Sequence, residues 1–351
     1  MSNATGQRGV WYALAAAALF GVSTPFAKIL TGEMPATMLA GLLYLGSGLG
    51  LGLCLLFRPG QTDGGNPLRA PDLPWLAGAI LFGGIAGPLL LMAGLQRIPG
   101  SSASLLLNLE GVLTALLAWL VFRENFDRRI LLGMVLIVAA GVLLAFQPGQ
   151  SLGLSYGALL VTGACACWAI DNNLTRKIAA GDALQIAALK GGVAGAVNLG
   201  IAFALHQTLP APTIMLMAGA IGFAGYGLSL VLFVLALRHL GTARTGAYFS
   251  AAPFVGAVVS LLVLHETPGI YFWAAALLMA IGIALHLMEN HGHAHQHKLQ
   301  DHAHPHDHDE HHRHTHETGE SLDEPHTHAH QHRPLRHSHG HFPDIHHRHE
   351  H

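Results

Sequence analysis

The sequence predicts an all-α membrane protein with ten transmembrane helices, arranged as two inverted five-helix repeats and followed by a disordered, histidine-rich cytoplasmic tail. Three observations support this prediction. First, 51% of the 351 residues are hydrophobic and only 11% are charged, whereas about a quarter of a soluble domain is charged. Second, apolar stretches of about 20 residues, the length that crosses a bilayer, recur along the chain. Third, residues 291–351 hold 23 of the 27 histidines.

Ten apolar stretches precede the tail, and short segments separate them. The separators carry glycine, proline and charged residues, as in "QRIPG" at 96–100 and "HETPG" at 265–269, and this composition favours turns. Glycines inside the stretches, as in "GLLYLGSGLGLGL", allow membrane helices to approach closely. We expect helices near residues 10–30, 36–57, 73–95, 101–122, 129–146, 154–174, 183–205, 213–237, 243–264 and 268–288.

The distribution of basic residues predicts the orientation of these helices. Positive charge is retained on the cytoplasmic side of a membrane. When the separators are assigned to alternate sides, ten basic residues fall on one side and only Lys28 and Arg97 on the other. The chain is therefore expected in the cell (inner) membrane, with its N- and C-termini in the cytoplasm.

An internal repeat divides the apolar part of the chain in two. The segment "ALLAWLVFRE" at 115–124 aligns with "AVVSLLVLHE" at 257–266, which pairs span four with span nine. Because each repeat then has five helices, an odd number, the two halves must insert with opposite orientation, and a substrate site is expected between them near the midplane. The predicted domains are residues 1–146, 147–290 and the tail, 291–351.

Four segments resemble the EamA-type transporters of the drug/metabolite transporter superfamily. These segments are "LFGVSTPFAKIL", "SSASLLLNLEGVLTALLAWLVFRE", "CWAIDNNLTRKIA" and "GAYFSAAPFVGAVVSLLVLHE". The resemblance covers about residues 10–290, implies a transporter, and does not specify a substrate. Two residues depart from the family pattern: Gly111 stands where a proline is usual, although Pro253 keeps that place in the second repeat, and Phe20 replaces a tryptophan.

A carboxylate, Glu110, lies in the middle of span four. A charge at that depth costs roughly 2.5–3.5 kcal/mol on insertion scales, so it marks a functional site by default. Lys190 lies about 10 Å into span seven along the helix axis, and the two side chains are expected to meet near the midplane. The alternatives are a purely structural ion pair, or a lysine that extends to the interface. A buried carboxylate could also bind and release a proton, which suits antiport.

Other polar side chains are candidates to line the same cavity. Asn108 lies two residues before Glu110, a polar cluster occupies span six, and Tyr248 lies in span nine. Each is more often a hydrogen bond between helices than a ligand. Glu124 and Glu266 end spans four and nine, and are not expected to bind substrate. The predicted substrate-binding residues are Glu110, Asn108, Lys190, Trp168, Asp171, Asn172 and Tyr248.

The tail repeats His-x-His and has little to bury, so disorder is expected. Neutral imidazole suits zinc, nickel and copper, and a flexible chain can bring several rings to one ion. The alternative is weak binding without a physiological role. No cofactor is required by the apolar part of the chain. The candidate metal ligands are His293, His295, His297, His302, His304, His306, His308, His326, His328 and His330.

The leading hypothesis is a secondary transporter that exports a small polar metabolite or an amino-acid-like compound by alternating access. One alternative is a divalent metal (Ni/Zn/Co) transporter that the tail supplies, and another is a membrane-anchored metal-binding or sensing protein. The formal charge of −2 argues against a nucleic-acid partner. No nucleotide fingerprint or metalloprotease motif is present, so an enzyme is not expected. The expected partners are the lipid bilayer, a small-molecule substrate and divalent metal ions; the oligomeric state is not predicted.

Overall fold

The computed structural model describes residues 2–57, 68–122, 128–146, 153–178, 181–240, 242–287, 292–296, 300–306, 326–332 and 336–340. These residues belong to two compact units, Met1–Glu289 and Asn290–His351. The first unit contains the helices, and the second contains short strands.

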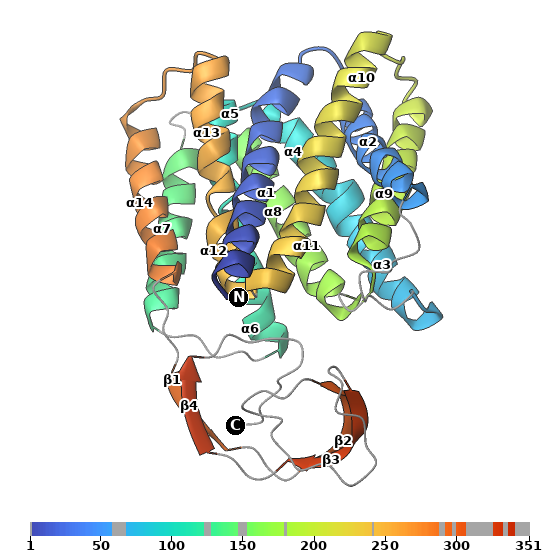
Figure 1. Ribbon diagram of the computed structural model, residues 1–351. Coiled ribbons are helices and arrows are strands. Elements are labelled where there is room, and N and C mark those ends of the chain that lie inside the picture. Colours follow the sequence, from blue (N-terminus) through green and yellow to red (C-terminus); the bar gives the residue numbers. More distant parts are fainter. Residues whose placement is uncertain are drawn as a thin grey trace. The chain divides into compact units, whose positions relative to one another are not determined.

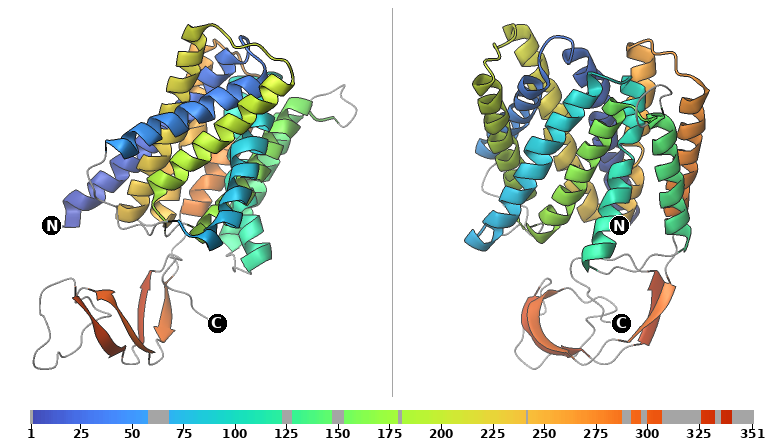
Figure 2. Two further views of the ribbon diagram at one scale, coloured as in Figure 1. Left: turned by 90° about the vertical axis from the view of Figure 1, so that its right-hand side faces the viewer. Right: turned by 180° about the vertical axis from the view of Figure 1, so that it is seen from behind.

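The described helices of the first unit fall into ten rods, at the places that the sequence predicts (Figures 1 and 2). Several rods consist of more than one segment. In order, the rods are α1 (Ser2–Leu30); α2 (Ala36–Leu56); η1 (Ala70–Asp72), α3 (Leu73–Ala79), η2 (Ile80–Ala86) and α4 (Gly87–Leu95); α5 (Gly100–Leu106) and α6 (Leu109–Phe122); α7 (Arg128–Ala145); α8 (Tyr156–Thr175) and η3 (Arg176–Ile178); α9 (Ala183–Ala204); α10 (Pro212–Ile221), η4 (Gly222–Leu228) and α11 (Ser229–Leu240); α12 (Thr242–Phe249) and α13 (Ala252–Val263); and α14 (Ile270–Leu287).

Six helices among the described residues are long and apolar enough to cross a membrane. Large apolar side chains point outward from the bundle, including Leu56 at 79% exposure and Leu216 at 75%, as expected where lipid replaces water. The first unit is therefore a multi-pass, all-helical membrane bundle. The six helices are Gln7–Leu30, Ala36–Leu56, Ala70–Leu95, Gly100–Leu117, Ala183–Ala204 and Pro212–Ala236.

The third rod of each half contains a π-helical segment of seven residues, η2 in the first half and η4 in the second. Both segments are rich in glycine, with the sequences "ILFGGIA" and "GFAGYGL". A π-helical turn is wider than an α-helical turn and is frequent at functional sites. The two halves therefore share a local irregularity that the sequence analysis did not anticipate.

The fourth rod of each half is broken at an equivalent place. α5 and α6 are separated at residues 107–108, and α12 and α13 at residues 250–251. Pro253 lies in the first turn of α13, where proline is tolerated. The break between α5 and α6 is present even though Gly111 replaces the usual proline, so the proline is not needed for it.

α2 and α9 pack together through glycines. A β-carbon added at Gly48 would overlap the backbone of Gly191 and Gly192, and one at Gly195 would overlap the backbone of Leu45. Only glycine permits helix backbones to lie this close in a membrane. This contact holds α9, which carries Lys190, in a fixed register against α2.

The second unit contains two antiparallel strand pairs within its described residues. β1 (Gly292–Gln296) pairs with β4 (Arg336–Gly340), and β2 (Gln300–His306) pairs with β3 (His326–His332). The sequence predicts disorder for the whole tail, and the structure differs over these four segments. The physical reason is that histidine at every second position has the period of a strand. Two of the candidate metal ligands, His297 and His308, lie outside the described residues.

Candidate functional site

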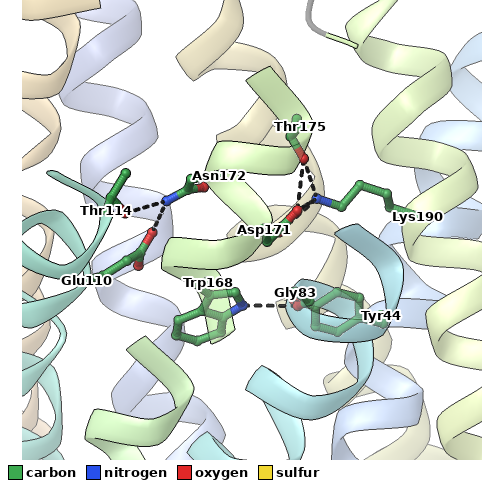
Figure 3. Close-up of polar contacts among 9 residues, drawn as sticks. All are labelled: Tyr44, Gly83, Glu110, Thr114, Trp168, Asp171, Asn172, Thr175 and Lys190. Atoms are coloured by element: carbon green, nitrogen blue, oxygen red, sulfur yellow. Dashed lines mark hydrogen bonds and ion pairs between the residues drawn. The ribbon is translucent and has the colours of Figure 1, made fainter. Parts of the chain in front are cut away.

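An ion pair joins α8 to α9 in the interior of the bundle (Figure 3). The Nζ atom of Lys190 lies 2.6 Å from Oδ1 and 2.8 Å from Oδ2 of Asp171. Thr175 donates to Asp171 Oδ1 at 2.8 Å and accepts from Lys190 at 3.3 Å. The two charged side chains are only 14% and 11% exposed, so the pair is largely desolvated.

A second polar group joins α8 to α6. Asn172, the residue after Asp171, donates from Nδ2 to Oε1 of Glu110 at 2.9 Å and to the hydroxyl of Thr114 at 3.3 Å. Figure 3 shows these three side chains pointing toward one another, on the side of α8 away from Lys190. Asn172 is exposed and Glu110 is half-buried, so this group lies in the more open part of the site.

The sequence predicts that the side chains of Glu110 and Lys190 meet. This prediction is wrong, because the partner of Lys190 is Asp171. The reason is topological. α8 and α9 are consecutive, so a residue near the end of α8 and one in the second turn of α9 come to a similar depth. The lysine therefore pairs with a carboxylate in the interior of the bundle.

Gly83, in the π-helical segment η2, connects α2 and α8. Its carbonyl oxygen accepts from Tyr44 Oη at 2.8 Å and from Trp168 Nε1 at 3.0 Å (Figure 3). A β-carbon at this position would overlap the carboxylate of Asp171. The next carbonyl, of Gly84, accepts from Asn198 Nδ2 at 2.9 Å. The glycines of η2 therefore leave room for the ion pair and supply acceptors to three helices.

Five aromatic rings form a continuous series through both halves, which we call the ring row. Tyr44 and Tyr226 have centroids 5.4 Å apart, and Tyr226 and Phe20 have centroids 6.0 Å apart. Phe20 is 5.6 Å from Phe249, and Phe249 is 4.8 Å from Phe233. All five residues are half-buried. The row begins at Tyr44, which shares the Gly83 carbonyl with Trp168.

Two predicted residues do not take part in these contacts. Asn108 is buried at the break between α5 and α6, where it donates to Leu105 O at 3.0 Å and to Met279 Sδ at 3.6 Å. Tyr248 lies on α12 and is 37% exposed. The amide group of Asn108 is therefore directed to α5 and α14.

Four residues take part in these contacts without having been predicted from the sequence: Thr114, Thr175, Tyr44 and Gly83. The two threonines could have been found from their spacing. Thr114 lies four residues after Glu110, and Thr175 lies four residues after Asp171, so each threonine shares a helix face with an acid. Tyr44 and Gly83 are brought to the site only by packing between distant segments, and the sequence carries no comparable signal for them.

The site is not duplicated in the second half. The alignment of residues 115–124 with 257–266 makes Ala252 the counterpart of Glu110, and Ala252 is buried. The bundle thus combines a repeated framework with a carboxylate that occurs in one half alone.

Glu266 makes a separate contact at the end of α13. Its carboxylate accepts from the backbone N–H groups of Gly100 at 2.6 Å and Ser101 at 2.9 Å, at the start of α5. The preceding residue, His265, has a left-handed φ of 53°, which turns the chain back toward α5. Nearby, Lys28 donates to the carbonyl of Leu95. The counterpart acid, Glu124, lies outside the described residues.

Metal ligands do not gather in the described part of the bundle. Among the residues searched, no three His, Cys, Asp or Glu side chains lie close enough together to hold an ion. The side chains of the tail are not described, so its predicted metal binding remains a prediction.

An interior carboxylate and ion pair within a bundle of apolar helices are typical of a membrane transport protein. A family model of EamA-like transporters matches residues 7–146 and 155–288. The chain belongs to the EamA-like transporter family. This confirms the resemblance seen in the sequence motifs, and it makes the protein a secondary transporter and not an enzyme.

Individual relatives agree with this class. The chain is 27% identical over 287 residues to an uncharacterized transporter of Methanothermobacter thermautotrophicus, covering 77% of this chain and 83% of that protein. It is 49% identical over 80 residues to a probable 4-amino-4-deoxy-L-arabinose-phosphoundecaprenol flippase subunit ArnE of Pseudomonas paraeruginosa, covering 23% and 66%. A solved crystal structure has the same fold, with a TM-score of 0.59 and 19% identity, covering 81% of this chain and 96% of that one.

Proposed function

We propose that this protein exports a small polar metabolite or an amino-acid-like compound across the inner membrane by alternating access. The observation that supports this most is the pair of contacts on α8, where Asp171 binds Lys190 and Asn172 binds Glu110. These contacts join α6 of the first half to α8 and α9 of the second. A movement of the halves against each other would change the surroundings of Glu110, as transport requires.

We further propose that the two halves are inverted repeats and that both termini are cytoplasmic. Each half has five rods, and an odd number reverses the orientation of the second half. The π-helical third rods and the broken fourth rods support the equivalence of the halves. The ten-to-two distribution of basic residues supports the cytoplasmic termini.

The proposed export uses an ion gradient, with Glu110 as the group that exchanges a proton for the substrate. The test is flux in proteoliposomes that contain the purified full-length chain, screened against amino acids, amines, nucleosides and divalent metals with an imposed pH gradient. Glu110→Gln keeps the size of the side chain and removes its charge, so we expect it to abolish or uncouple flux. Glu33→Gln, at an exposed acid outside the site, is the matched control. Flux of Glu110→Gln at the wild-type rate and pH dependence would contradict the proposal.

The register of the strand pairs supports a second role, metal binding by the tail. Histidine stands opposite histidine at five positions of the backbone register of the two pairs. We propose that the tail binds zinc, nickel or copper, and a divalent metal as substrate remains the alternative to a metabolite. The paired positions are His293 with His339, His295 with His337, His302 with His330, His304 with His328, and His306 with His326.

A further inference from the structure

Resting on the proposed function, we infer that α5 and α13 form a gate at the outer end of the bundle, which is closed in this structure and which Glu266 holds shut. The first argument is an asymmetry between the two broken rods. α5 packs against α13 (Figure 1), and the repeat makes α12 the counterpart of α5 and α6 the counterpart of α13. In the described part of the bundle, α6 packs on α7 and α8, and α12 packs on α1, α11 and α14. A contact that is made at one end of an inverted repeat and not matched at the other marks the closed end.

The surfaces that α5 and α13 present to each other consist of small residues. A β-carbon added at Gly100 would lie 2.9 Å from Ser260 Oγ, and one added at Gly256 would lie 2.8 Å from Ser104 Oγ. Each of these serine hydroxyls therefore lies against a glycine of the opposite helix. Small residues let membrane helices approach closely, so the closed pair leaves little room for a solute between its helices.

The hydroxyl groups in this contact indicate that it opens. Ser101, Ser104 and Ser260 are at most 1% exposed, and their hydroxyls have no hydrogen-bond partner in the described part of the chain. Buried polar groups are normally paired, and one that is left unpaired costs free energy. A permanent helix contact would be more stable with alanine at these positions. A contact that separates exposes the hydroxyls to water, so the three serines favour the open state of the gate.

Glu266 acts in the opposite direction. Its carboxylate, at the end of α13, accepts from the backbone N–H groups of Gly100 and Ser101 at the start of α5. These two N–H groups belong to the first turn of α5, where no carbonyl of the same helix reaches them. Hydrogen bonds to an ionised acceptor are about twice as strong as neutral ones. The charged contact therefore stabilises the closed state against the unpaired hydroxyls.

The experiment measures access to the gate with a membrane-impermeant maleimide. The reagent is added to right-side-out vesicles that contain the full-length chain, with its 3 native cysteines replaced by alanine. Ser104→Cys and Ser260→Cys place a thiol on either helix of the gate, and Ser47→Cys, buried where α2 meets η4, is the control. We expect labelling at both gate positions and none at the control. Gate positions that stay as unreactive as the control overturn the inference.

Two changes to the gate should act in opposite directions on the labelling of Ser104→Cys. Glu266→Gln keeps the size of the side chain and removes its charge, so labelling should become about tenfold faster, a shift of about 1.4 kcal/mol in the opening equilibrium. Ser101→Ala combined with Ser260→Ala removes two unpaired hydroxyls, so labelling should slow. Glu33→Gln, at an exposed acid, should leave the rate unchanged. Equal rates in all of these variants overturn the inference.

Flux separates a failure of the gate from a failure of the proposed export. Flux in the substrate screen by a protein whose gate positions stay unlabelled overturns the gate and leaves the export intact. Labelling that responds to Glu266→Gln, without flux of any screened compound, supports the gate and counts against the export.

Discussion

Asp171 and Asn172 are neighbours in the chain, yet they bind different helices: Asp171 holds Lys190 of α9, and Asn172 holds Glu110 of α6. Successive residues of a helix point about 100° apart, so the two contacts lie on different sides of α8. This division assigns different roles to the two acids. The ion pair holds α8 and α9 together, and Glu110 accepts a hydrogen bond from Asn172.

The structural role of the pair predicts a charge rescue. Lys190→Met leaves Asp171 buried without its cation, a change that costs about 3–5 kcal/mol in comparable pairs. We expect a clearly lower melting temperature in detergent for Lys190→Met, and recovery of most of the loss in the double variant Asp171→Asn, Lys190→Met. A single variant that melts like the wild type would show that the pair does not stabilise the bundle.

The position of Gly83 predicts a steric block. Gly83→Ala places a β-carbon where the Asp171 carboxylate lies, so either the ion pair or the π-helical segment must shift. We expect loss of flux and a lower melting temperature. Gly200→Ala is the control, because a β-carbon there meets nothing within 4 Å and alanine favours a helix by roughly 0.5–1 kcal/mol over glycine. Equal behaviour of the two variants would rule out the steric argument.

The contact of Glu266 with α5 predicts local protection. Hydrogen bonds to a charged group contribute about 1.5–3 kcal/mol, and Glu266 accepts two from the backbone of α5. Glu266→Ala should speed hydrogen exchange at the Gly100 and Ser101 amides, while exchange in α2 stays unchanged. Unaltered exchange at these two amides would mean that the contact contributes little.

The proposed orientation predicts the result of reporter fusions. A reporter placed after Gly60 should be cytoplasmic, and one placed after Pro148 should lie on the opposite side, since three spans separate the two points. Activity on the same side in both fusions is incompatible with the assignment.

Metal binding by the tail predicts a dependence on pH. Imidazole binds metal only when it is neutral, and its ordinary pKa is about 6.5. Binding should therefore be strong near pH 7 and weaken as the pH falls to 5. Calorimetry with zinc or nickel, on the full-length protein and on a variant that ends at residue 290, measures how much of the metal binding is due to the tail. Equal heats for the two proteins at neutral pH would exclude the tail as the binding site.

The helical part of the fold could be predicted because its signals are local. Apolar stretches long enough to span a bilayer predict the helical rods. The cost of inserting a charge identifies Glu110 as a candidate site residue. The family could be predicted from motifs in spans one, four, six and nine. Each of these signals is contained within one segment, so no knowledge of packing was needed.

The contacts within the site could not be predicted from the sequence, because they depend on which helix faces meet. The similar depth of Glu110 and Lys190 in their spans suggested that these two residues pair. In the structure α8 and α9 are consecutive, and Lys190 pairs with Asp171. Asn108 is a predicted cavity residue, and the structure adds a contact with Met279 that the sequence does not indicate. The π-helical segments escaped notice because glycine pairs in an apolar stretch also suit ordinary close packing.

The presence of Glu110 in one half only, with Ala252 as its counterpart, limits the stoichiometry of the proposed exchange. One carboxylate neutralises one positive charge at a time. If a proton and a substrate with one positive charge use it in turn, one charge crosses in each direction and the full cycle is electroneutral. Exchange would then respond to a pH gradient and be insensitive to the membrane potential, so an electrical current during steady exchange would require a second charged group.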